Sequence, residues 1–162
     1  MKIFLELIVF CGTFILMVKL GAGNSGLNEL YFYPEEYQKI AYEKGLADPV
    51  KVKEDKKKFM MVFIPVLLVM LVVMIYLNRV NNFAEAYLQA LLFLEVMNIF
   101  DGIVIDRIWV GTSRLWLIEG MEGVPYVKPW KRVFFERTLL AVIWVVMAAV
   151  VAGIVMIIGG IR

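Results

Sequence analysis

The sequence predicts an all-α membrane protein, a four transmembrane helix bundle with two cytoplasmic loops that contain short interfacial helices. Three observations support this fold class. Hydrophobic residues make up 62% of the 162 residues and charged residues only 20%, against about 45–50% and ~25% in a soluble domain. The apolar residues form four blocks, each near the ~20 residues that cross a bilayer. Basic residues gather between alternate blocks, and the length fits one integral membrane domain, residues 1–162.

The four predicted spans differ in how many polar residues they carry. The first covers about residues 3–20 and is charged only near its ends, and the second, about residues 59–77, has no charge. The third, about residues 83–105, contains several polar residues, and a carboxylate at a helix centre costs ~2.5–3.5 kcal/mol. Its other side chains are apolar enough to favour insertion. The fourth covers about residues 138–161.

The basic residues predict how the spans are oriented. Seven lysines lie in the loop at residues 21–58, and six basic residues lie in the loop at residues 106–137. Only Lys2, Arg79 and Arg162 fall on the opposite side. Because loops rich in Lys and Arg stay in the cytoplasm, both loops are predicted to lie inside and both termini outside.

The first span is predicted to be retained and not to be a cleaved signal peptide. A signal peptide has an apolar core of ~7–15 residues and a small-residue cleavage site. Here the apolar block is longer, and Lys19 follows it. Cleavage would also place the lysine-rich loop outside, against the distribution of charge.

The first loop contains one predicted short helix and a lysine run. Pro34 suits a first helical position, and Gly45 suits a C-terminal stop. The lysines within residues 51–58 have two interpretations. They either fix the topology as a solvated run or bind anionic lipid headgroups at the inner face, at ~1 kcal/mol per basic residue.

The second loop interleaves aromatic and basic residues, the pattern of the lipid headgroup layer. Gly120 and Pro125 break this loop and predict a re-entrant or interfacial hairpin. No RNA-binding motif accompanies the aromatic residues, so nucleic acid is not an expected partner. The predicted interface anchors are Trp109, Trp116 and Trp130.

The third span carries a polar stripe that predicts a site inside the bundle. At 100° per residue, Glu95, Asn98 and Asp106 lie within about 80° of one another. Such groups are expected to face other helices or a wet cavity. Two interpretations follow, a binding site for a proton, a cation or a headgroup, and a hydrogen-bonded cluster that holds the helices together. The candidate binding residues are Glu95, Asn98, Asp101, Asp106 and Arg107, with Lys19 and Arg114 as possible charge partners.

No catalytic residue, metal or cofactor is predicted. The chain has no histidine, which removes the commonest general base and metal ligand. Its one cysteine, Cys11, is interpreted as a small buried side chain. In the fourth span, Ala149 and Gly153 form a small-xxx-small pair. This pair predicts a contact in a homo- or hetero-oligomer, with chance in an Ala/Gly-rich helix as the alternative.

The stretch from Asn98 to Trp116 contains Asn98, Phe100, Asp101, Asp106 and Trp109 at a characteristic spacing. It resembles a family of small, uncharacterised four-span bacterial membrane proteins with the pattern Asn-x-Phe-Asp-x-x-x-x-Asp-x-x-Trp-Val-Gly-His-Thr-Lys. The likeness covers most of residues 30–130. The resemblance implies a four-span architecture and a bacterial cell membrane, and it implies no activity.

This chain departs from that family at one position of the pattern. Thr112 stands where the family often has histidine. Any role of that histidine in the family does not extend to this chain.

Three functions remain open at this point. The first is a small-solute or ion binding, transport or accessory protein that uses the polar stripe. The second is a membrane enzyme acting on lipid headgroups at the cytoplasmic interface, with the arginines as phosphate binders. The third is a structural partner subunit of a membrane complex.

Overall fold

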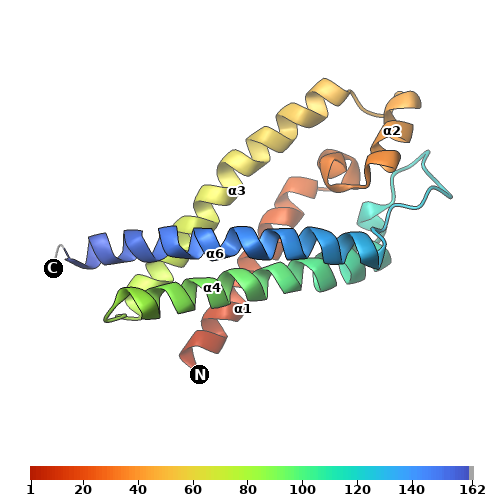
Figure 1. Ribbon diagram of the computed structural model, residues 1–162. Coiled ribbons are helices and arrows are strands. Elements are labelled where there is room, and N and C mark those ends of the chain that lie inside the picture. Colours follow the sequence, from red (N-terminus) through yellow and green to blue (C-terminus); the bar gives the residue numbers. More distant parts are fainter. Residues whose placement is uncertain (161–162) are drawn as a thin grey trace.

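The computed structural model describes residues 1–160, and this part of the chain forms helices joined by turns and short irregular segments, with no strand. The predicted all-α fold is confirmed, while Ile161 and Arg162, at the predicted end of the fourth span, lie outside the described residues. Four helices are long and apolar enough to cross a membrane. They are α1 (Lys2–Ala22), α3 (Pro49–Leu77), a continuous helix Phe83–Thr112 that begins as α4 (Phe83–Phe100), and α6 (Trp130–Gly160) (Figure 1).

The outward surface of these helices is apolar. Between 17% and 39% of the residues in each apolar window are buried inside the protein, so most of these apolar side chains face outward. A water-soluble bundle shows the reverse pattern, with polar residues outside. Exposed apolar side chains occur on all four helices, among them Ile8, Leu16, Val69, Leu88 and Val146.

Two of the long helices begin earlier than the sequence prediction. α3 begins at Pro49, so the lysines of residues 51–58 are helical and not part of a loop. Asp48 is its N-cap and accepts a hydrogen bond from the Val50 backbone N–H at 2.8 Å. An N-cap Asp followed by Pro at the first position is a standard helix start. Hydropathy does not detect this signal, because it marks the apolar block and not the first residue of the helix. α6 likewise begins at Trp130.

Helices α4 and α6 pack closely through small residues. Ala86 and Ala90 on α4 are fully buried, as are Ala148 and Ala152 on α6. Small side chains allow helix backbones to approach each other in a membrane. The small residues of α6 that pack against α4 are therefore Ala148 and Ala152, one position before the predicted pair. Ala149 and Gly153 are half-buried, and their role in an oligomer stays a prediction.

The end of the bundle that carries the N-terminus is tied by a polar cluster. The Asn78 side-chain amide donates hydrogen bonds to Glu6 at 2.9 Å and to Gln89 at 3.0 Å. Lys2 donates to the Leu77 carbonyl oxygen at 3.2 Å. These bonds join α1, α3 and α4 at one end. From there, α3 diverges from α6 toward its own N-terminus (Figure 1).

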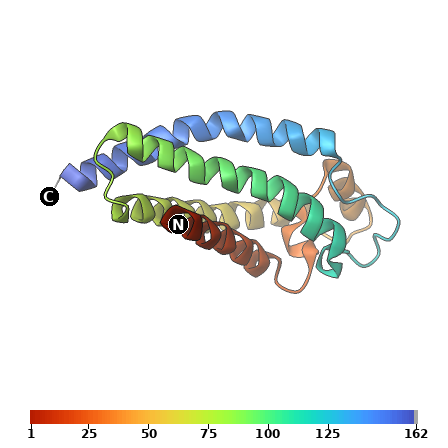
Figure 2. The same ribbon diagram turned by 90° about the horizontal axis from the view of Figure 1, so that it is seen from below.

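At the other end, the two long connections pack together as a structure that we call the inner cap. It comprises η1 (Gly26–Phe32), α2 (Glu35–Glu43), η3 (Arg114–Trp116) and the turns at residues 117–129. Figure 2 shows both connections at the same end of the bundle. The short helix predicted before Gly45 is α2. The second loop, predicted as a re-entrant or interfacial hairpin, packs against the first connection.

The core of the inner cap is aromatic. The Tyr33 hydroxyl donates to the Trp116 carbonyl oxygen at 2.8 Å, and the rings of Tyr33 and Tyr37 stack with centroids 5.0 Å apart. Trp116 is only 2% exposed, so its prediction as an interface anchor is wrong. Its ring lies inside the cap, and its centroid is 6.2 Å from that of the Tyr33 ring. Trp130 is 58% exposed, which agrees with a place in the headgroup layer.

Glu29 is a buried carboxyl group in the inner cap. It is fully buried, and its two carboxyl oxygens have no hydrogen-bond partner within residues 1–160. A Cβ atom on Gly21 would lie 2.0 Å from one of these oxygens, so only glycine at position 21 leaves room for the carboxyl group. Burial raises the pKa of Glu29 from 4.5 to about 8, which makes it neutral near pH 7.

The raised pKa of Glu29 predicts a pH-dependent stability. The folded protein keeps a proton that the unfolded chain releases between pH 4.5 and about 8. The free energy of unfolding therefore falls as the pH rises through this window and levels off above it. Glu29→Gln should remove this fall while keeping the shape of the side chain. Thermal unfolding in detergent across the window checks this, and identical pH slopes for the two proteins would contradict it.

Candidate functional site

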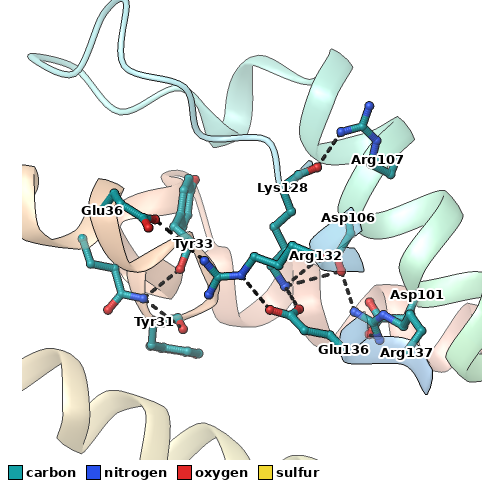
Figure 3. A network of polar contacts seen from close by, with 11 residues as sticks. Tyr31, Tyr33, Glu36, Asp101, Asp106, Arg107, Lys128, Arg132, Glu136 and Arg137 are labelled. Atoms are coloured by element: carbon teal, nitrogen blue, oxygen red, sulfur yellow. Dashed lines mark hydrogen bonds and ion pairs between the residues drawn. The ribbon is translucent and has the colours of Figure 1, made fainter. Parts of the chain in front are cut away.

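A network of ion pairs joins the third and fourth spans near the inner cap (Figure 3). Arg137 on α6 donates hydrogen bonds to Asp101 and, at 2.5 Å, to Asp106. Lys128 lies 3.4 Å from Asp106 and 2.9 Å from Glu136. Arg132 donates to Glu136 at 2.9 Å. We call these side chains of Asp101, Asp106, Lys128, Arg132, Glu136 and Arg137 the ion-pair network.

A π-helix brings the two aspartates to one guanidinium. In an α-helix, residues five apart differ by about 140° around the axis. The helix is a π-helix, η2, over Asp101–Trp109, and its i→i+5 hydrogen bonds place residues five apart on nearly the same face. The α-helical spacing used for the prediction leaves Asp101 outside the arc of about 80° that Glu95, Asn98 and Asp106 occupy. Mid-helix π segments are rare and occur often at functional sites.

Two small or polar residues fix the position of Arg137. A Cβ atom on Gly102 would lie 3.0–3.2 Å from the Arg137 side chain, so the glycine between the aspartates lets this side chain pass close to the helix. Asn98 donates from its side-chain amide to the Arg137 backbone oxygen at 2.9 Å. Asn98 is buried, and its role is to hold α6 against α4.

The structure separates the predicted stripe residues. Asn98, Asp101 and Asp106 gather around Arg137, whereas Glu95 is half-buried beside Asn98, with 3.5 Å between the amide nitrogen and a carboxylate oxygen. Glu95 is the farthest of these four from the inner cap along the helix. It is thus a neighbour of the network and not one of its ion pairs.

The predicted charge partners are wrong. Lys19 donates to the Gly23 carbonyl oxygen at 2.6 Å, because the last carbonyls of a helix lack partners within it. Arg114 is exposed and makes no ion pair within residues 1–160. The partners are Arg137 and Lys128, which were used only to predict orientation. The sequence does contain a signal for Arg137 as a partner. It is a basic residue at the edge of one apolar block, and the preceding span carries carboxylates.

Arg107 supports the network through the backbone. It donates to the Lys128 carbonyl oxygen at 2.5 Å and lies over the Trp130 ring, 4.6 Å from its centroid. Trp109 packs edge-on against Trp116, with centroids 5.2 Å apart. Arg107 therefore positions Lys128 and does not pair with a carboxylate.

A cavity of about 660 Å³ lies between the four long helices and the inner cap. This volume is within the ~300–1,000 Å³ of small-molecule sites. Its walls in the middle of the bundle are apolar and come from all four long helices. They include Phe14, Phe63, Leu67, Leu94, Ile143 and Met147.

The end of the cavity nearest the inner cap is charged, and we call it the charged end. Five members of the ion-pair network line it, together with Asn98 and with Lys56 on α3. These residues are Lys56, Asn98, Asp101, Asp106, Lys128, Glu136 and Arg137. Within the described residues, no hydrogen bond or ion pair links α3 between residues 49 and 70 to α4 or α6. The cavity thus changes from apolar to charged along the bundle, and the described part of α3 that lines it makes no polar bond to α4 or α6.

The carboxylates of the charged end are not arranged as a metal site. Across residues 1–160, no group of three or more His, Cys, Asp or Glu side chains is placed to hold a metal ion. Asp101 and Asp106 contact Arg137, and Glu136 contacts Lys128 and Arg132. Comparisons of the chain with protein-family models, curated proteins and solved structures found no match.

Proposed function

We propose that this multi-pass membrane protein binds an amphiphilic small molecule, one with an apolar chain and a polar head, from the inner leaflet of the membrane. The observation that carries the proposal is the cavity, whose lining changes from apolar side chains to the ion-pair network along the bundle. Such a gradient matches an amphiphile lying along the helices. The chain would contact Leu67 and Met147, and the head would contact the charged end.

The energetics favour an amphiphile over a free ion. A bare cation needs unpaired oxygen ligands, and each carboxylate of the charged end already has a cationic partner. An apolar chain that moves from lipid to apolar walls exchanges one apolar environment for another. The paired charges offer hydrogen-bonding edges to the head without leaving a buried charge uncompensated. Glu95, the residue expected for ion transport, does not line the cavity.

The charge distribution supports a cytoplasmic position for the inner cap. Most of the basic residues lie in the inner cap or in the helix ends next to it, so the positive-inside rule favours a cytoplasmic cap with both termini outside. The resemblance around Asn98 and Trp109 supports a bacterial cell membrane. Exposed Trp130 and the lysines of α3 then lie where anionic headgroups of the inner leaflet are found.

The proposed function predicts that the purified protein retains an amphiphile. Leu67→Trp should fill the apolar part of the cavity and reduce the amount retained about tenfold, since the lost contacts of a chain amount to ~1–3 kcal/mol. The matched control is Val69→Trp, because Val69 is on the same helix, 62% exposed and outside the cavity. Extraction and mass spectrometry after exchange into defined detergent measure the retained amphiphile. Equal retention by both variants, or none in the unaltered protein, would contradict the proposal and favour a structural partner subunit.

A second candidate function is favoured by the π-helix. It places Asp101 and Asp106 side by side at the charged end, where they face a bound headgroup, as in an enzyme that acts on lipid headgroups. Incubation of the protein in nanodiscs with a headgroup-labelled phospholipid tests this function. Release of label that Asp106→Asn abolishes would favour the enzyme, and no release would leave the binding function alone.

A further inference from the structure

One charged side chain of the charged end lies outside the ion-pair network. Each carboxylate of the ion-pair network is already paired with Lys128, Arg132 or Arg137, and Arg132 also contacts Glu36 at 3.8 Å. Lys56 lines the same end of the cavity from α3. It is exposed and makes no ion pair within residues 1–160. Among the described residues that line the charged end, Lys56 therefore has the one ammonium group that is available to an anion.

The position of Lys56 is different from that of the other lysines of α3. Lys58 lies 3.9 Å from Glu54 and 3.7 Å from Asp55 on its own helix. Lys53 and Lys57 are exposed and do not line the cavity. Lys56 alone combines an unpaired ammonium group with a place on the cavity wall. Its side chain and the ion-pair network come from different helices, and no hydrogen bond or ion pair within residues 1–160 joins residues 49–70 of α3 to α4 or α6.

We propose that the amphiphile bound in the cavity has an anionic head, a carboxylate or a phosphate, and that Lys56 determines this specificity. The inference rests on the proposed function and names the class of ligand for the same cavity. An ammonium group binds oxyanions as a point charge, whereas a cationic head would find every lining carboxylate already paired. A bound oxyanion would also give α3 a polar contact inside the cavity, where its residues 49–70 make no hydrogen bond or ion pair with α4 or α6.

Binding of a matched set of single-chain amphiphiles tests the inference. The probes share one alkyl chain and carry a carboxylate, a phosphate or a quaternary ammonium head. The protein is held in nanodiscs of neutral, zwitterionic lipid. We expect at least one anionic probe to bind about tenfold more tightly than the cationic probe, the factor expected for a charge-assisted contact of ~1.5 kcal/mol. The two anionic arms distinguish a fatty-acid head from a phosphate head, and inorganic phosphate at the same concentration should not compete.

Substitutions then assign the preference to Lys56. Lys56→Gln should remove the tenfold preference, Lys56→Arg should keep it, and Lys57→Gln is the control that should leave it unchanged. Equal binding of anionic and cationic probes, or a preference that survives Lys56→Gln, would overturn the inference and leave the proposed function intact. If no probe binds, and Leu67→Trp and Val69→Trp retain the same amount of amphiphile, the proposed function itself fails. Competition by inorganic phosphate would overturn the assignment to an amphiphile.

Discussion

Replacing Arg137 by methionine is expected to destabilise the folded protein by about 3–5 kcal/mol, the cost of removing one partner from a buried ion pair. Arg137 contacts both Asp101 and Asp106, so its loss leaves two carboxylates with only Lys128 nearby. Unpaired charge within a membrane-spanning helix is unfavourable. Thermal unfolding in detergent, with the yield of folded protein as a second readout, measures the effect.

Two further variants identify the cause of this loss. Adding Asp101→Asn and Asp106→Asn to Arg137→Met should recover a large part of the stability, because neutral amides replace the unpaired charges. Arg132→Met is the matched comparison. Arg132 and Glu136 are each about a third exposed, and Lys128 still contacts Glu136, so the loss should be ~0–1 kcal/mol. Equal losses of stability for Arg137→Met and Arg132→Met would contradict the burial of the ion pairs between Arg137 and the two aspartates.

The substitution Gly26→Ala is expected to destabilise the inner cap by about 2–4 kcal/mol, from overpacking and a lost hydrogen bond. A Cβ atom at position 26 would lie 2.1 Å from the Tyr33 hydroxyl and 3.1 Å from backbone atoms of Leu115 and Trp116. The hydroxyl must move, which breaks its bond to the Trp116 carbonyl oxygen. Burial raises the pKa of Tyr33, so its hydroxyl remains a donor at neutral pH. Tryptophan fluorescence during thermal unfolding reports on this region.

Gly12→Ala provides the control for a glycine-to-alanine change. A Cβ atom on Gly12 meets no atom within 4 Å, and Gly12 lies inside α1. Alanine there should be neutral or stabilise by ~0.5–1 kcal/mol through helix propensity. If the Gly26→Ala and Gly12→Ala variants unfold at the same temperature, this result would contradict the close packing of the two connections in the inner cap.

Hydropathy sufficed to predict the four long helices, because a bilayer requires about 20 apolar residues in each. It failed at boundaries where helices extend past the apolar block. α3 runs from Pro49 through its lysines, since the N-cap at Asp48 and helix propensity set its start and not hydropathy. The start of α6 at Trp130 was missed for the same reason.

The candidate site was predictable only in part. Asn98, Asp101 and Asp106 were identified because polar residues in a span need partners. The convergence of the two aspartates on Arg137 depends on the π-helix η2, and no residue pattern available in one sequence distinguishes a π-helix from an α-helix. The inner cap was also missed, because contacts such as Tyr33 with Trp116 join residues 83 positions apart. Hydrophobic periodicity describes one segment at a time, and it therefore does not predict contacts between segments that are far apart in the sequence.

Photo-cross-linking of an amphiphile tests the central claim, that the cavity between α3 and α6 binds such a molecule. The probe carries a diazirine in its alkyl chain and is added to the protein in nanodiscs, and peptides with saturable adducts are mapped. Our account predicts adducts on the cavity walls, at residues such as Leu67, Ile143 and Met147, and their loss in Leu67→Trp. Saturable adducts confined to outward-facing side chains such as Val69 and Val146 would contradict it.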